Sequence, residues 1–170
     1  MQNLKIRIIA AIVLFANLVL SGIAQVSVPI EKEPRHRLKF ENKYVRLLNV
    51  LNPVGDTTLY HAHSNDDVSI RVGDATILDE VLNGEKIKFA LKTGDIAFAA
   101  RPVPMTHRVI NKGTTDFRNI FIEILPSAAG TTIDKEPAPL PGRTILLDNA
   151  RVRVYRLILK PGESNNYTHM

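Results

Sequence analysis

The 170-residue chain has no cysteine and no tryptophan, and only 6% of its residues are aromatic. The absence of cysteine excludes a disulfide framework, a thiolate zinc site, an iron–sulfur cluster and a cysteine nucleophile. The sequence also has no Gly-rich phosphate-binding loop and no dinucleotide-binding fingerprint. Ser64 and Ser69 have no recognisable triad partners, so a serine hydrolase is unsupported. The side chains that remain as candidates for a functional site are therefore histidines and carboxylates.

The excess of positive charge is small and scattered along the chain. The formal net charge is +5, and it falls to +3 if the first 24 residues, which contain Lys5 and Arg7, are removed. Because the basic residues form no cluster, nucleic acid is not an expected partner. A hydrophobic content of 45% over this length suits one globular domain with its own core, and is too little for two complete domains.

The first 24 residues are typical of an export signal. Lys5 and Arg7 precede the apolar run Ile8–Leu20, and the small residues Gly22 and Ala24 occupy the −3 and −1 positions of a cleavage site. A membrane anchor is the alternative, but a run of 13 residues is shorter than the ~20 helical residues that cross a bilayer. We therefore predict a signal-peptide helix and an extracytoplasmic mature protein, periplasmic or secreted, with no membrane association after cleavage.

From about residue 37 to residue 125 the pattern favours β structure throughout. Short apolar or alternating runs recur at intervals of roughly ten residues, with turn residues between them. Asn83-Gly84 predicts a two-residue hairpin, because both residues tolerate a positive φ angle. About eight short antiparallel strands predict an all-β barrel or sandwich. The expected strands are Val45–Leu51, Thr57–His63, Val68–Val72, Thr76–Val81, Lys86–Leu91, Ile96–Ala99, His107–Asn111 and Phe117–Leu125.

The C-terminal part of the chain repeats the start of this β region. A proline-rich stretch separates the two and is typical of a linker. Pro34–His63 then aligns without gaps on Pro141–Met170 at a constant offset of 107, with Asn42 on Asn149 among the identical pairs. The second copy has no complete set of histidines. The expected organisation is a signal peptide (1–24), a barrel domain (25–126), a linker (127–143) and the start of a second, incomplete repeat (144–170).

The strongest indication of a binding site is the pair His61 and His63. The two residues are two apart on an expected strand, so both imidazoles project from one face with their backbones ~7 Å apart. That separation lets both reach one ion with bonds of ~2.0–2.1 Å. Asp67 follows in the next turn or strand, and His107 begins a later strand. Three neutral nitrogens and a carboxylate suit divalent iron, manganese, zinc, nickel or copper, and do not choose among them.

The residues around these histidines resemble the two motifs of the cupin family. The matching positions are, in order, Gly55, His61, His63, Asp67 and Gly73, and then Gly94, Pro102, His107 and Asn111. The resemblance covers roughly residues 37–125. It implies a small antiparallel β-barrel of the double-stranded β-helix or jelly-roll type, often dimeric, with one divalent metal inside. The partial repeat further suggests an ancestor with two such barrels.

The family's metal-ligand positions fall on His61, His63, Asp67 and His107 of this chain. Two departures matter. Asp67 stands where the family usually has Glu, and its shorter side chain is expected to reach a metal only through water. Pro104 stands in place of a glycine. The alternative interpretation is a cupin barrel without a metal, in which His61 and His63 are ordinary interior or rim residues.

Two classes of function remain open at this point. The first is a metal-dependent oxygenase or isomerase of a small organic substrate, in which an open metal position polarises substrate or dioxygen. The second is a non-catalytic small-ligand-binding or structural cupin. The fold hosts many chemistries and does not decide between them. The expected partners are a small molecule and a second copy of the chain in a homodimer.

Four further residues are expected to have mainly structural roles. Arg71 and Arg101 follow the candidate ligands closely enough to hold an anionic substrate, although solvated surface charge is the simpler interpretation. His36 lies in a polar stretch and is expected to be exposed. Tyr60 is expected to pack rather than to act as an acid.

Overall fold

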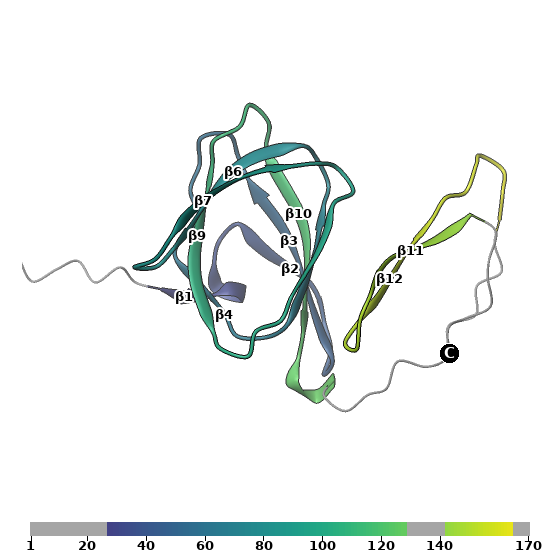
Figure 1. The fold of residues 1–170 in the computed structure, drawn as a ribbon, viewed down its shortest axis with the longest axis horizontal. Coiled ribbons are helices and arrows are strands. Elements are labelled where there is room, and N and C mark those ends of the chain that lie inside the picture. Colours follow the sequence, from purple (N-terminus) through teal and green to yellow (C-terminus); the bar gives the residue numbers. More distant parts are fainter. Residues whose placement is uncertain (1–26, 129–141, 165–170) are drawn as a thin grey trace, which may run out of the picture.

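The computed structural model describes residues 27–128 and 142–164 of the chain (Figure 1). The expected signal peptide and most of the expected linker lie outside these residues. None of the described helices is long and apolar enough to cross a membrane. The elements of the barrel are β1 (Val28–Pro29), the 3₁₀ turn η1 (Ile30–Lys32), β2 (His36–Glu41), β3 (Val45–Asn52), β4 (His61–His63), β5 (Asp67–Arg71), β6 (Ala75–Val81), β7 (Lys86–Leu91), β8 (Ile96–Ala99), β9 (Met105–Asn111), β10 (Phe117–Ile124) and the turn η2 (Pro126–Ala128).

The barrel consists of two facing five-stranded sheets (Figure 1). Sheet A has the order β1-β4-β9-β6-β7, and sheet B has the order β2-β3-β10-β5-β8. From β3 to β10 the chain passes repeatedly from one sheet to the other, and only β6 and β7 are consecutive strands of one sheet. The pairs are antiparallel except for the short parallel pair of β1 and β4. This topology confirms the expected all-β jelly roll.

The expected strands agree with the structure except around β2 and β4. Strands β7 and β8 have the expected bounds, and the β6–β7 hairpin turns at Asn83, which has a φ of 56°. The expected strand from Thr57 is regular only over His61–His63, with Thr57 joined to Ile110 by an isolated bridge. Strand β2, which pairs with β3 at the edge of sheet B, was not among the expected strands, although its charged residues Arg37, Lys39 and Glu41 alternate with Leu38 and Phe40.

The interior of the barrel contains a packed apolar cluster and an unusual number of polar residues. The apolar cluster comprises Ile30, Leu48, Val50, Ala75, Ile77, Val109, Phe117 and Phe121. On β10 the buried face carries Asn119 and Glu123, while Ile120 and Ile122 lie half-buried on the opposite face. Burying a polar side chain costs free energy unless a partner compensates for it. An interior of this kind is typical of a binding site rather than of a purely structural core.

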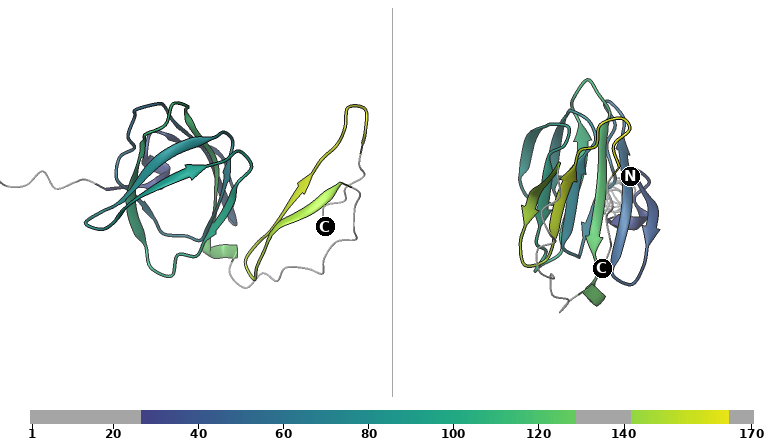
Figure 2. Two further views of the ribbon diagram at one scale, coloured as in Figure 1. Left: turned by 45° about the horizontal axis from the view of Figure 1, so that its top comes forward. Right: turned by 90° about the vertical axis from the view of Figure 1, so that its right-hand side faces the viewer.

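Beside the barrel lies a separate hairpin of β11 (Arg143–Asp148) and β12 (Arg153–Leu157) (Figure 2). Its strands repeat the β2–β3 hairpin, and β11 has the bounds of β2 at the offset of 107. The β2–β3 register shifts between Leu38 and Phe40, and the β11–β12 register shifts between Ile145 and Leu147, at the same offset.

The turns of the two hairpins are also equivalent. Asn42 Oδ1 accepts hydrogen bonds from the backbone N–H groups of the residues two and three positions ahead, at 2.8 and 2.9 Å. Asn149 Oδ1 does the same at 2.7 and 2.9 Å. In both turns the arginine after the turn pairs with the acidic residue before it, Arg46 with Glu41 and Arg153 with Asp148. The sequence repeat is therefore also a repeat of local structure, while the expected domain boundaries stay a prediction.

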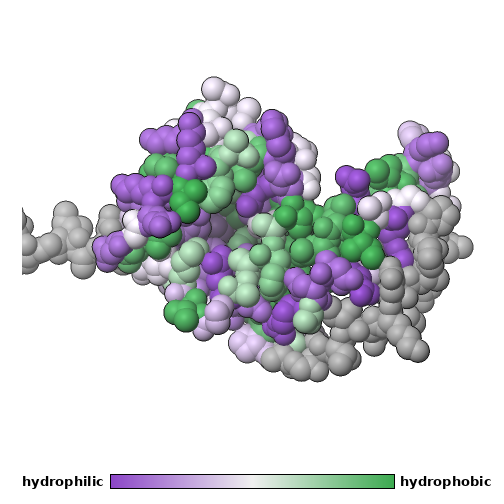
Figure 3. Space-filling view, in the orientation of Figure 1, coloured by the Kyte–Doolittle hydropathy of each residue, from purple (hydrophilic) through white to green (hydrophobic). Residues whose placement is uncertain are grey.

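One ion pair ties the second hairpin to the barrel. Arg151 Nε lies 2.9 Å from Asp66 Oδ2 in the loop between β4 and β5. Exposed apolar side chains occur on β2, at Leu38 and Phe40, and on β11, at Ile145. Figure 3 shows apolar side chains gathered between the barrel and the hairpin.

Candidate metal centre

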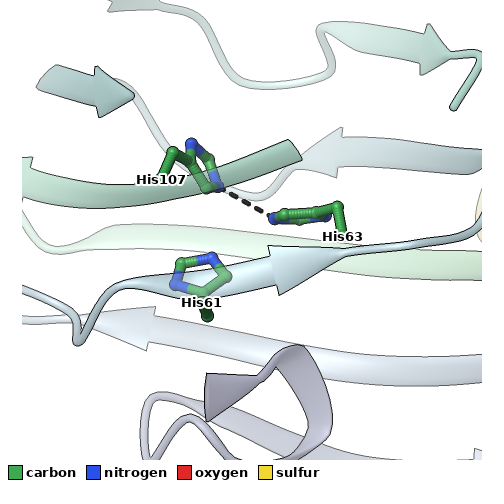
Figure 4. Close-up of side chains that lie close together, drawn as sticks. All are labelled: His61, His63 and His107. Carbon is green, nitrogen blue, oxygen red and sulfur yellow. Dashed lines mark hydrogen bonds between the residues drawn. The ribbon is translucent and has the colours of Figure 1, made fainter. Parts of the chain in front are cut away.

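Three histidines converge inside the barrel on the inner face of sheet A (Figure 4). His61 and His63 stand at the two ends of β4, where strand alternation turns both inward. His107 lies on the neighbouring β9, directly opposite His61 in the antiparallel register. The three residues are buried, and one ligand atom from each lies within 4.8 Å of the others. The structure thus brings together three of the four expected ligands.

His61 presents a bare nitrogen to the interior. Its Nδ1 lies 2.9 Å from the backbone carbonyl of Leu59, so Nδ1 carries the proton and donates it. The other nitrogen, Nε2, is buried and has no hydrogen-bond partner among the described residues. Burial above all, and then the proximity of His36 and His107, lowers the pKa of His61 to about 2. His61 is therefore neutral and keeps a lone pair on Nε2.

A carboxylate fixes the tautomer of His107. Asp79 Oδ1 lies 2.6 Å from His107 Nδ1, so Nδ1 donates a hydrogen bond to Asp79, and the lone pair of the neutral ring is on Nε2. That nitrogen lies 2.8 Å from His63 Nε2 (Figure 4). His63 then donates from Nε2, and its buried Nδ1 has no hydrogen-bond partner in the part of the chain that the structure describes. Burial, and then the neighbouring histidines, strongly lower the pKa of His63, so this ring is also neutral.

The donor set fits a divalent metal ion. His63 Nε2 and His107 Nε2 are 2.8 Å apart, close enough for both to bind one ion with bonds of ~2.0–2.1 Å. A cation bound by both nitrogens would require His63 Nε2 to be unprotonated. The His63 proton would then be on Nδ1, which has no hydrogen-bond partner among the described residues. The carboxylate behind His107 is the outer-shell arrangement that accompanies most metal-binding histidines.

Asp67, the fourth expected ligand, is beside this group but not in it. The residue is 3% exposed, and its Oδ2 accepts a hydrogen bond from Arg101 Nε at 2.9 Å. The same oxygen lies 3.9 Å from His63 Nδ1. Burial raises the pKa of Asp67, and Arg101 opposes that shift. A role for Asp67 as a ligand therefore stays a prediction, and in this structure its carboxylate is bound by Arg101.

The histidines open onto a cavity of about 180 Å³ between the two sheets. Its lining includes Arg71 and Arg101, so the interpretation of these arginines as solvated surface charge was wrong. The expectation that His36 is exposed was also wrong, since it is 8% exposed and lines the cavity. Its Nδ1 bonds to Oε2 of Glu33 at 2.7 Å, and Glu33 is itself fully buried.

Sequence reasoning found the three histidines of the candidate site but missed the carboxylates that hold the cavity histidines His107 and His36. Asp79 and Glu33 lie outside the two motifs, and each fixes a histidine through Nδ1. Tyr60 packs as expected, and its hydroxyl donates to Glu80 at 2.9 Å. Asn52 and Asn111 lie close to the same core, where each amide donates to a backbone carbonyl.

The strand order and the positions of the histidines together decide the type of fold. Strands alternate between two facing sheets, and the histidines of both motifs meet on adjacent strands of one sheet. The barrel is a cupin-type double-stranded β-helix. Its candidate metal site lies at the position that the resemblance implied, inside the cupin barrel and on β4 and β9.

Comparison with known proteins finds similar folds among solved structures. A cupin domain from Bordetella pertussis is 29% identical, with 52% of this chain and 90% of that chain covered and a TM-score of 0.47. An uncharacterized conserved protein with a double-stranded β-helix domain from Klebsiella pneumoniae is 21% identical over 65% of this chain and 92% of its own, with a TM-score of 0.45. A cupin family protein from Methanocaldococcus jannaschii is 11% identical over 62% of this chain and 95% of its own, with a TM-score of 0.44. No family model and no curated protein matches the chain.

Proposed function

We propose that this chain is an exported cupin-type protein that binds one divalent metal ion through His61, His63 and His107. The site is best supported by the imidazole nitrogens of the three histidines, which are buried and close together. All three are buried on one face of sheet A, and His61 Nε2 has no partner among the described residues. Neutral imidazoles held from behind by a carbonyl or a carboxylate are good ligands for iron, manganese, zinc, nickel or copper.

We retain Asp67 as the carboxylate of the proposed site, in a supporting position. Its distance of 3.9 Å from His63 Nδ1 suits a partner for the proton that moves to Nδ1 when Nε2 binds an ion. Arg101 holds the carboxylate at the cavity wall and balances its charge. The shorter aspartate side chain therefore has a structural use that does not require a direct bond to the metal.

The proposed activity is that of a metal-dependent oxygenase or isomerase of a small organic molecule. A bound divalent ion with an open position would supply Lewis acidity to a substrate oxygen. The chain's own residues would shape the rest of the site. Phe121 and Val109 give the cavity wall apolar surface, and Asp79 keeps His107 in one tautomer. Glu33 binds His36 through Nδ1 and so fixes the orientation of this ring in the cavity wall.

The alternative is a non-catalytic barrel that binds a small ligand. The apolar side chains around the cavity, such as Phe117 and Ile77, favour this function because they would bind a carbon skeleton without any metal. The two functions differ in one property, the presence of a tightly bound ion.

The decisive experiment measures the metal content of the purified chain beside a His61→Ala/His63→Ala double variant. Near-stoichiometric metal in the wild type that is lost in the double variant supports the site. His36→Asn is the matched control, because it removes a buried cavity histidine outside the group of three. No metal in the wild type after loading with iron(II), manganese and zinc, with an intact β spectrum in circular dichroism, contradicts the proposed metal function.

Export is tested separately from metal binding. The protein is recovered from the periplasmic or extracellular fraction, and its N-terminal residue is determined. Gln25 as the first residue supports cleavage after Ala24. Recovery only from the cytoplasm with an uncleaved N-terminus contradicts the localisation.

A further inference from the structure

The wall of the cavity formed by sheet B carries a polar strip that the metal proposal does not use. Ser69 and Arg71 share the inner face of β5 with Asp67, because residues two apart on a strand point to the same side. Asn119 on β10 pairs directly with Arg71 in the antiparallel register. All of these residues line the same cavity as the three histidines.

Arg71 has no ion-pair partner within the described ranges 27–128 and 142–164. Its guanidinium lies 5.7 Å from the centre of the Phe117 ring, whereas Arg101 and Arg108 form ion pairs at 2.9 Å. Burial lowers the pKa of Arg71, while Asp95, Asp67 and Asp79 act on it from beyond ion-pair distance and oppose that shift. A partly desolvated cation without a close counter-ion is costly, and such a group is suited to bind an anion.

Asn119 is the second unpartnered group on this wall. The residue is 4% exposed, and its Oδ1 is buried without a hydrogen-bond partner among the described residues. Because the two ends of an amide are distinguished only by their hydrogen bonds, the side chain can equally present Nδ2 to the cavity. Ser69, which is 6% exposed, adds a hydroxyl donor on the adjacent strand. Arg71, Asn119 and Ser69 thus offer three kinds of donor on one wall.

The cavity also limits the size and the charge of the ligand. Its volume of about 180 Å³ is below the ~300–1,000 Å³ of pockets for drug-sized ligands. Phe117, Phe121 and Val50 provide apolar surface for a carbon skeleton. A doubly charged phosphate would be repelled by Asp67 and Asp79, which line the same cavity, so a singly charged group is favoured.

We propose that Arg71, assisted by Asn119 and Ser69, binds the carboxylate of a small monocarboxylic acid whose apolar part lies between the two sheets. A small monocarboxylic acid would be the substrate class of the site described above. This assignment rests on the proposed function only because the other end of the acid would face the metal-binding histidines. A carboxylate matches the planar guanidinium fork in geometry and can accept from the amide and the hydroxyl at the same time.

The test is calorimetric titration of benzoate and butanoate into the purified chain and into an Arg71→Gln variant. Arg71→Gln is expected to weaken binding of the better acid by about 10-fold to 100-fold, as for loss of a charge-assisted hydrogen-bonded pair. Arg71→Lys, which keeps the charge, is expected to recover part of the affinity. Arg118→Gln is the matched control, since Arg118 is an exposed arginine on the outer face of β10. Benzamide, the neutral analogue of benzoate, is expected to bind both proteins equally weakly.

Each titration is carried out on zinc-loaded and on chelator-treated protein, so that the two proposals can fail separately. Unchanged affinity for both acids in Arg71→Gln, with zinc still bound, overturns the anion site and leaves the metal proposal intact. Arg71-dependent binding of an acid in a chain that takes up no metal supports the anion site and contradicts the metal proposal. Failure of both acids to bind at millimolar concentration, or tighter binding of inorganic phosphate, overturns the monocarboxylate assignment.

Discussion

The two walls of the cavity have different chemistry although both are built from antiparallel strands. Sheet A contributes His61, His63 and His107, which are neutral at neutral pH or held by a carboxylate. Sheet B contributes Asp67 and Arg71, which are charged groups at the opposite side of the same space. A barrel made of two sheets can therefore separate metal ligation from substrate recognition. Variants of the histidines should leave acid binding intact, and variants of sheet B should affect metal binding least; the following predictions test that separation.

The largest effect is expected from His107→Ala on sheet A. The substitution removes the only proposed ligand on β9 and leaves His63 Nε2 without its partner at 2.8 Å. We expect the chain to lose stoichiometric metal, measured by elemental analysis after dialysis, while it keeps its binding of benzoate or butanoate. Retention of metal at the wild-type level would show that the two histidines of β4 suffice.

Acid is expected to destabilise the metal-free protein through sheet A. The pKa of His61 is near 2 in the folded chain and 6.5 as a free side chain. Below pH 6.5 the unfolded state therefore binds more protons, and the free energy of unfolding falls as the pH falls. The loss is roughly 2 kcal/mol between pH 6.5 and pH 5 for each histidine of this kind. His63 shifts in the same direction.

Urea denaturation of chelator-treated protein at pH 7 and at pH 5 measures this effect. His61→Gln removes one titrating group and should reduce the difference. Asp67 on sheet B has a raised pKa, so the stability that it contributes decreases as the pH rises through its unfolded value of 3.8. This contribution opposes that of the histidines, so a lower stability at pH 5 than at pH 7 still reports the histidines. Equal stability at pH 7 and pH 5 would contradict neutral, buried histidines.

Asp79→Asn should weaken metal binding without abolishing it. Asn keeps the size of the side chain but removes the charge that fixes His107 through Nδ1 at 2.6 Å. Loss of an outer-shell carboxylate is expected to cost about 10-fold to 100-fold in metal affinity. Competition with a chromophoric chelator measures the affinity. Asp74→Asn, which disturbs exposed contacts with Lys92 and Thr93 away from the histidines, serves as the control and should leave metal affinity unchanged.

The smallest effect on the metal is expected from Asp67→Asn on sheet B. Its carboxylate lies 3.9 Å from His63 Nδ1 and is held by Arg101, so we expect metal affinity to fall by about tenfold, the lower end of outer-shell effects. The same chelator competition measures it, with Asp66→Asn as the neighbouring control. A loss as large as that of His107→Ala would instead make Asp67 a direct ligand.

The sequence was sufficient to predict most strands of the barrel and the three histidines, because both depend on local spacing. Alternation on β4 places His61 and His63 on one face whatever the neighbours are. Alternation on β10 does not reveal which face is internal, and the apolar Ile120 and Ile122 lie on the less buried side. The inner face of β10 is identified in the structure by the burial of Asn119, Phe121 and Glu123.

Contacts between distant strands account for what was missed. Asp79 reaches His107 because β6 pairs with β9, with Asp79 opposite Val109 in the register. Arg71 lines the cavity because β5 lies between β10 and β8 in sheet B. Neither pairing leaves a signal in the spacing of residues along the chain, so a charged residue on a short strand was indistinguishable from surface charge.

The repeated hairpin bears on the order in which the barrel assembles. The same asparagine turn and the same register shift occur in β2–β3, which pairs onward with β10, and in β11–β12, which forms a two-stranded sheet by itself. The hairpin conformation is therefore encoded by its own short segment, and its closure costs little chain entropy. The pairing of β10 with β3 joins distant parts of the sequence, so closing that loop costs more chain entropy. During folding the N-terminal hairpin can form first and act as a template, and the last strand of the barrel then closes against it.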